Sequence, residues 1–183
     1  SLNRLDLSSS LTTSNPPKDL LTVISKTSIS ELYLSNLNWK KLRHGDIPPM
    51  PNLRVLHLDL SLLESIEENA FYGLEDLTKL SLKGNFIKHI SLYLLEPMRR
   101  LEYLDLSGYQ SSHKRSHNVS RFHIEPKALI HVNDLKELNL NYQNLEVLQR
   151  GVFLGLYKLE RLHLRGCNIK VIQYLAFFPL KSI

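Results

Sequence analysis

One spacing pattern dominates the sequence: LxxLxL, with leucine or another apolar residue at its three fixed positions, recurs along the whole chain. Consecutive copies start 27, 24, 24, 24, 34 and 24 residues apart. Because a single short coil cannot bury its own apolar edge, a near-constant period of this length predicts similar coils stacked on one another. The copies start at Leu2, Ile29, Leu53, Leu77, Leu101, Leu135 and Leu159.

Each copy predicts a short strand followed by a return segment. The LxL portion alternates apolar and polar residues, which is the pattern of a strand with one buried face. In three copies a phenylalanine follows 18 residues after the start, at Phe71, Phe153 and Phe177, with a leucine three residues later. We expect the strands to pair side by side in a parallel sheet and the return segments to run along the opposite side.

The return segments "ENAFYGLEDL" and "RGVFLGLYKL" are two versions of one template. Together with LxxLxL they resemble the 24-residue form of the leucine-rich repeat. This resemblance covers essentially the whole chain. It implies an α/β solenoid, an arc with a parallel sheet on its concave face and short helices, turns and loops on its convex face.

The repeat also predicts the domain organisation. Residues 1–183 would form a single domain of about seven repeats. The chain starts on one repeat and stops at Ile183 as another opens, without the cysteine-rich caps that often end such arcs. We therefore expect an internal slice of a longer solenoid that lacks both caps. A small arc capped by other means is the alternative.

The residue that follows each strand by three positions has a structural role in this family. There an asparagine side chain bonds the backbone of adjacent coils and satisfies buried polar groups. Asn85 matches, and Cys167 is expected as a small buried substitute in this ladder rather than as a nucleophile. Leu37 and Tyr109 lack a suitable side chain, so we expect irregular turns there. The remaining equivalents are Ser10, Ser61 and Gln143.

Two repeats depart from the template. In the first, "TTSNPPKDL" carries Pro16 and Pro17, which we expect to exclude regular structure from its return segment. The fifth repeat is ten residues longer than its neighbours and holds a polar insertion over residues 108–125. Its basic and histidine residues are candidate contacts for a ligand or partner, because solenoid insertions project from one face. They are His113, Lys114, Arg115, His117, Arg121 and His123.

Three other interpretations of the insertion stay open. It is a solvated loop without a specific role, a histidine cluster that senses pH, or a metal site at His113 and His117, for which no further ligand is evident. Asn118 starts the N-x-[ST] sequon of the chain and is a candidate glycosylation site if the protein is secreted. A glycan there would disfavour a closely packed contact at that point.

Strand residues that alternate with the core leucines should point outward on the concave side. Lys79 with Lys83 and Arg161 with Arg165 make two basic spots, and Tyr103 and His163 lie on the same strands. These six residues are candidate contacts for an acidic ligand, with a solvated sheet face as the alternative. The two spots are not continuous, so a nucleic-acid groove is only weakly indicated.

Composition bounds the function classes. The net charge of +5 mildly favours acidic partners. The single cysteine forms no internal disulfide, and no apolar run is long enough to span a membrane. The chain shows no secretory leader and none of the common phosphate-loop, zinc-protease, serine-hydrolase or paired-cysteine motifs. We expect no catalysis, no cofactor and no metal.

Several segments also resemble Toll-like receptor ectodomains. They are "ENAFYGLEDLTKLSLKGNFIKHI", "LEYLDLSG" and "RGVFLGLYKLERLHLRGCNIKVI". The resemblance implies recognition of a protein or microbial ligand outside the cell or in an endosome, ligand-induced pairing of receptors, and signalling by a membrane-anchored parent of which this chain is a soluble part. The alternatives are an extracellular adhesion or matrix protein without signalling, and an intracellular scaffold, which a lone free cysteine would suit.

Overall fold

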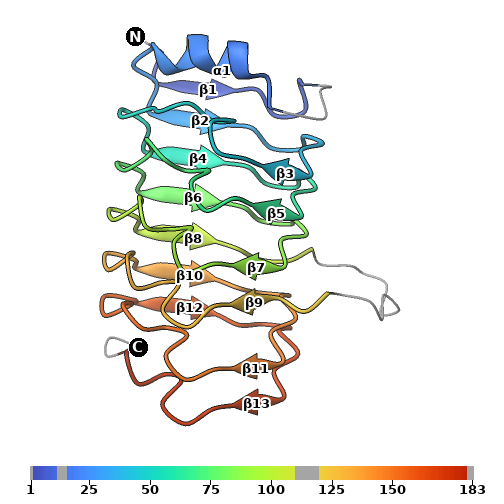
Figure 1. Cartoon of the computed structure of the whole chain (residues 1–183), viewed down its shortest axis with the longest axis vertical. Helices are drawn as coiled ribbons and strands as arrows, with labels where there is room; N and C mark the ends of the chain where they lie inside the picture. The colour runs from blue at the N-terminus through green and yellow to red at the C-terminus, as the bar shows by residue number, and fades with distance from the viewer. Residues whose placement is uncertain (1, 12–15, 110–119, 181–183) are drawn as a thin grey trace.

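The strands pair into one seven-stranded parallel sheet that runs the length of the molecule (Figure 1). The structure is a computed structural model that describes residues 2–11, 16–109 and 120–180. Neighbouring strands in the sheet follow chain order, so the predicted parallel-sheet solenoid is confirmed. The strands are β1 (Arg4–Asp6), β2 (Glu31–Tyr33), β4 (Val55–His57), β6 (Lys79–Ser81), β8 (Tyr103–Asp105), β10 (Glu137–Asn139) and β12 (Arg161–His163).

The register of this sheet places equivalent repeat positions side by side. The middle residues of three successive strands, Leu56, Leu80 and Leu104, are direct partners, and all three are fully buried. The longer fifth repeat does not shift the register, because Leu104 of β8 pairs with Leu138 of β10. The greater length of that repeat therefore does not interrupt the pairing of the sheet.

Short strands also form on the return side of the coils, where only turns, loops and short helices were expected. They make three parallel pairs that lie beside the main sheet (Figure 1). The pairs are β3 (Lys41–Leu42) with β5 (Ser65–Ile66), β7 (His89–Ile90) with β9 (His123–Ile124), and β11 (Val147–Leu148) with β13 (Val171–Ile172).

The return segment of the first repeat holds the one α-helix among the described residues, α1 (Lys18–Ser25). The prediction that Pro16 and Pro17 exclude regular structure there is wrong. Pro17 is the N-cap residue, where its missing N–H costs nothing, and its carbonyl accepts the N–H of Leu21 at 3.0 Å. The helix then buries Leu21 and Ile24 against the neighbouring coil. The prolines precede the helix rather than break it.

The core lies between the sheet and the return side. Phe71 and Phe153 are fully buried in the return segments of their coils. Phe177 occupies the same repeat position in the last described coil, where it lies 5.6 Å from the Phe153 ring and is 39% exposed. The rings of Phe153 and Phe177 thus stack across two neighbouring coils at the end of the core.

A ladder of side-chain hydrogen bonds joins the coils just beyond the strands. Asn85 Nδ2 donates to the carbonyl oxygens of Leu58 at 2.8 Å and Leu82 at 2.7 Å. Asn85 Oδ1 accepts the backbone N–H groups of Ser61 and Leu63 at 2.9 and 3.0 Å. The side chains of three other residues at this position, Ser61, Gln143 and Cys167, also donate to the carbonyl of the preceding coil.

The two positions with unsuitable side chains behave differently from each other. Leu37 is buried, and the preceding Asn36 has a φ of 56°, in the left-handed region that other turns of the ladder also use. The expected irregularity is therefore absent at Leu37. At Tyr109 the side chain is 62% exposed and the φ of the preceding Gly108 lies outside the left-handed region, so this turn is irregular as predicted.

Candidate ligand-binding face

The outward side of the seven-stranded sheet carries most of the polar residues that the sequence pattern placed there. Two of them are not free surface groups. Ser81 and Asp105 are only 3% and 4% exposed. Ser81 Oγ donates to Asp59, and Asp105 accepts from Asn139 Nδ2 at 3.0 Å. Some polar side chains of the sheet face therefore already hydrogen-bond to one another.

Aromatic and cationic groups stack at the N-terminal end of this face. The Arg4 guanidinium lies 4.3 Å from the centre of the Tyr33 ring, and the Tyr33 ring stacks on His57 at 4.6 Å. His57 Nδ1 lies 3.2 Å from Asp59. Cation–π and stacking contacts hold these side chains in fixed positions across strands β1, β2 and β4.

The first predicted basic spot contains two lysines in different environments. Lys79 Nζ lies 4.8 Å from the centre of the Tyr103 ring, whose hydroxyl donates to Asp105 at 3.2 Å. Burial, and then the charge of Asp105, raises the pKa of Tyr103 well above its ordinary value. Lys83 is exposed and forms no ion pair within the described part of the chain. Lys83 is therefore the available cation of this spot.

The second predicted basic spot is largely neutralised. Arg161 Nε contacts Glu137 at 2.7 Å, and His163 Nε2 lies 3.2 Å from the same carboxylate. Burial would raise the pKa of Glu137, but the hydrogen bond and charge of Arg161 outweigh it and lower the pKa. Arg165 remains exposed at the strand end. Glu137 thus leaves little net positive charge at Arg161, which sequence spacing did not indicate.

A second ladder runs along the rim of this face, at the residue that follows each LxL by one position. We call it the rim ladder. Ser8 Oγ accepts the N–H of Ser35 at 3.1 Å, and Ser35 Oγ accepts the N–H of Asp59 at 3.1 Å. Asp59 Oδ1 then accepts the N–H of Lys83 at 3.0 Å. Each side chain receives the backbone of the next coil.

The rim ladder breaks at Lys83 and Ser107. Lysine has no acceptor, so the N–H of Ser107 bonds instead to Asp105 of its own coil at 2.8 Å. Ser107 Oγ is buried and has no hydrogen-bond partner. The ladder resumes at Asn141, whose Oδ1 accepts the N–H of Arg165 at 2.7 Å. The break coincides with the start of the fifth repeat's insertion.

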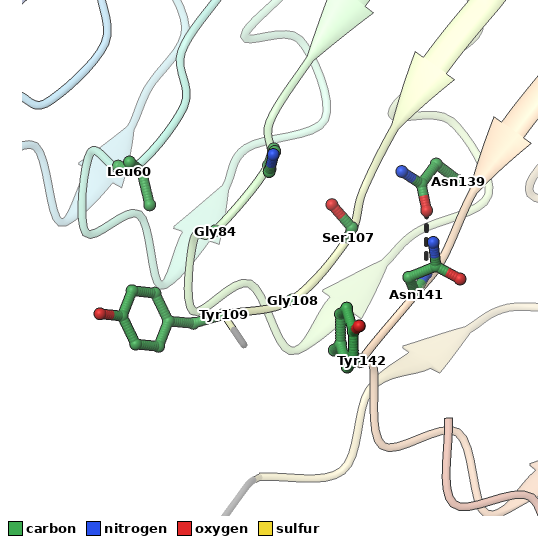
Figure 2. A pocket seen from close by; sticks show the side chains of 9 residues that line it. Leu60, Gly84, Ser107, Gly108, Tyr109, Asn139, Asn141 and Tyr142 are labelled. Carbon is green, nitrogen blue, oxygen red and sulfur yellow. Dashed lines mark hydrogen bonds between the residues drawn. The ribbon is translucent and has the colours of Figure 1, made fainter. Parts of the chain in front are cut away.

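A hollow of about 290 Å³ lies at this break (Figure 2). Figure 2 shows Tyr109 and Tyr142 on either side of Gly108, with Ser107 above Gly108 and Asn141 between Tyr142 and Asn139. We call it the rim hollow. Its lining residues are Leu60, Lys83, Gly84, Ser107, Gly108, Tyr109, Asn139, Asn141 and Tyr142.

The insertion candidates do not join this site within the described residues. Arg121 Nε lies 3.7 Å from Glu146, and His123 on β9 stacks on His89 at 5.6 Å, on the return side of the coils. His113, Lys114, Arg115, His117 and Asn118 lie outside the described residues. The parts of the chain that are described contain no group of three metal-ligating side chains suited to an ion.

Among residues 2–11, 16–109 and 120–180, no helix is long and apolar enough to cross a lipid bilayer.

Comparison with known proteins shows the family. A model of the leucine-rich repeat matches residues 51–110 and 118–183. The chain belongs to the leucine-rich repeat family.

Within that family the chain resembles Toll-like receptors. It is 30% identical to Toll-like receptor 3 of Boselaphus tragocamelus over 90% of this chain and 18% of that protein. It is 26% identical to Toll-like receptor 2 type-1 of Gallus gallus over 77% of this chain and 17% of that protein. The chain therefore spans less than a fifth of the length of these relatives.

Two solved structures share the fold over 90% of this chain. The Drosophila Toll–Spatzle complex gives a TM-score of 0.70 at 25% identity, and the match covers 22% of the chain in that structure. The complex of TLR13 with ssRNA13 gives a TM-score of 0.64 at 23% identity, and the match covers 26% of the chain in that structure.

Proposed function

We propose that this chain is a ligand-recognition segment in the ectodomain of an innate immune receptor of the Toll-like kind. The observation that carries the proposal is the similarity to Toll-like receptors 3 and 2, which covers 90% and 77% of the chain. A stacked parallel sheet suits recognition, because a rigid surface loses little conformational freedom when a ligand binds.

The exposed sheet-face residues are the proposed contacts. Lys83 and Arg165 are cations without an ion-pair partner among the residues described. Lys79 and Tyr103, on the neighbouring strands β6 and β8, form a cation–π pair. Arg161 and His163 would contribute after a ligand competes with Glu137. These features favour a protein or microbial ligand with acidic groups, and ligand-induced pairing of two receptors would carry the signal.

The proposed location is the extracellular side of the cell surface or the lumen of an endosome, in a membrane-anchored parent. The sequon at Asn118 supports it, because N-glycans are added in the secretory pathway. We also propose that the chain is not catalytic, since Cys167 is buried in the ladder, where its thiol donates to the Leu140 carbonyl.

The native protein tests this proposal. We expect it in the membrane fraction of its source tissue, with a mass that falls on treatment with peptide:N-glycosidase and a deamidated Asn118 in the released peptide. A glycosylated protein found in the soluble secreted fraction would instead support an adhesion or matrix protein. An unglycosylated protein in the cytosol would exclude both and leave an intracellular scaffold.

A further inference from the structure

The rim hollow has the chemistry of a binding site for a compact acidic group. Lys83 is its one charged lining residue, and no carboxylate lines it. Two other lining residues offer hydrogen-bond donors, the Ser107 hydroxyl and the Asn141 side-chain amide. Asn139 is already committed, since its Nδ2 donates to Asp105 at 3.0 Å and its Oδ1 accepts the N–H of Asn141 at 3.0 Å.

Ser107 provides the second, independent sign of a ligand. It is 3% exposed, yet its Oγ has no partner, and buried hydroxyls are rarely left in this state. In the rim ladder the equivalent serines Ser8 and Ser35 each accept a backbone N–H. The group that Ser107 would accept, the N–H of Asn141, is taken by Asn139. Ser107 thus lines the hollow with a hydroxyl that has no partner in the described portion of the chain.

The floor of the hollow is fixed by backbone packing. A Cβ on Gly108 would meet the carbonyl oxygen of Tyr142 at 2.6 Å, and a Cβ on Gly84 would meet Leu60 at 2.4 Å. Both glycines therefore let neighbouring coils approach closely beside the hollow, and a side chain at Gly108 would meet the backbone of the next coil. The hollow is a built feature of the coil stack rather than a gap between mobile side chains.

The walls favour a ring. Tyr109 is 62% exposed at one side, and Tyr142 stands at the other side of Gly108 (Figure 2). Tyrosine rings offer flat apolar faces with a polar end, which suit the C–H face of a sugar. The volume of 290 Å³ lies just below the range of small-molecule sites, about 300–1,000 Å³, and suits one ring better than a polymer.

We propose that the rim hollow binds an acidic pyranose, a sugar ring that carries a carboxylate. The carboxylate would lie between the Lys83 ammonium and the Ser107 hydroxyl, where charge-assisted hydrogen bonds are strongest. Ring hydroxyls would meet the Asn141 amide, and the ring would rest against Tyr109. The site goes beyond the proposed receptor role and does not depend on it, since a purified chain suffices for binding.

The test is a titration of the 183-residue chain with glucuronic acid, followed by ¹H–¹⁵N NMR at the amides of Gly84 and Gly108 and the side chain of Asn141. We expect saturable shifts at these groups, and glucose, which has the ring without the carboxylate, to bind about tenfold more weakly or worse. Methyl glucuronide, with its anomeric oxygen blocked as in a glycan, separates the two sources: equal binding indicates a glycan residue, and lost binding indicates a free sugar acid.

Three variants assign the site. Lys83→Met should weaken the binding of glucuronic acid by about tenfold or more. Lys88→Met, which changes an exposed lysine of the same coil outside the hollow, should leave this affinity unchanged. Ser107→Ala should weaken binding without lowering the melting temperature. The proposal is overturned if glucuronic acid gives no saturable shifts, if glucose binds equally well, or if Lys88→Met acts like Lys83→Met. Any of these results would leave the membrane and glycan tests of the receptor role untouched.

Discussion

The side-chain nitrogen of Asn85 lies 2.8 Å from the carbonyl oxygen of Leu58, which precedes it by 27 residues. This bond crosses from one coil to the one before it, inside the core. Neighbouring coils are therefore joined by buried polar contacts as well as by stacked leucines.

Loss of the Asn85 side chain should destabilise the chain strongly. Asn85→Ala removes hydrogen bonds from four backbone groups, of Leu58, Leu82, Ser61 and Leu63, and each buried group left unpaired costs about 1–3 kcal/mol. We expect the free energy of unfolding in urea to fall by at least about 3 kcal/mol. Lys88→Ala, at an exposed lysine of the same coil, should cost less than about 0.5 kcal/mol. Similar losses for both variants would contradict the ladder.

Two buried serines should respond in opposite ways. Ser61 Oγ donates to the carbonyl of Leu34 at 3.2 Å and accepts the N–H of Leu37 at 3.3 Å, so Ser61→Ala should cost about 1–3 kcal/mol. Ser107→Ala removes a hydroxyl without a partner, so the melting temperature should stay or rise. Thermal unfolding followed by circular dichroism measures both. A large loss at Ser107 would mean that its hydroxyl is satisfied in solution.

The contrast between these serines shows how far sequence alone reaches. The periodic leucines were sufficient to predict the parallel sheet. The position three residues after each strand was sufficient to predict Asn85 and Cys167 as members of the ladder. The sheet register follows from one apolar period, which is a local property of the chain. The rim ladder follows from the same period, and the signal for its break was present: Lys83 is a donor in a column whose preceding members Ser8, Ser35 and Asp59 can all accept.

Other features depend on contacts that spacing does not reveal. The helix after Pro17 depends on Leu21 and Ile24 reaching the next coil. The charge of Arg161 is offset by Glu137, one coil earlier, so a basic spot by composition is nearly neutral in space. The free hydroxyl of Ser107 arises because Asn139 takes the N–H that Ser107 would have accepted. Such competition between neighbours is visible only in three dimensions.

Cys167 should react slowly with alkylating reagents in the native state. It is 2% exposed, and burial raises the pKa of its thiol, so both access and thiolate content are reduced. Modification by iodoacetamide at pH 8, followed by mass spectrometry, should be slow in buffer and fast in urea. Cys167→Ser should keep the bond to the Leu140 carbonyl and most of the stability. Rapid native modification would show that the last coils open readily.

Stability should fall as the pH drops through the range in which histidine titrates. Burial, and then the charge of His89, lowers the pKa of His123, with Arg121 acting in the same direction and Glu125 opposing. Because the unfolded chain then binds more protons, the free energy of unfolding decreases as the pH falls below about 6.5. Carboxylates with lowered pKa, such as Glu137, lose their contribution only below about pH 4.5.

A substitution separates these two effects. His123→Gln should remove the decrease that sets in below about pH 6.5 and leave the loss that the carboxylates cause at lower pH. Urea unfolding at each pH provides the measurement. An unchanged profile in the His123 variant would assign the decrease to other groups.

The sequence of the parent transcript on the 3′ side of the codon for Ile183 tests the central claim most directly. A receptor ectodomain requires an apolar span of about 20 residues downstream, followed by a cytoplasmic signalling domain. We predict both, after further leucine-rich repeats. A stop codon that follows a repeat cap with no apolar span between would contradict the signalling receptor and leave a secreted leucine-rich protein.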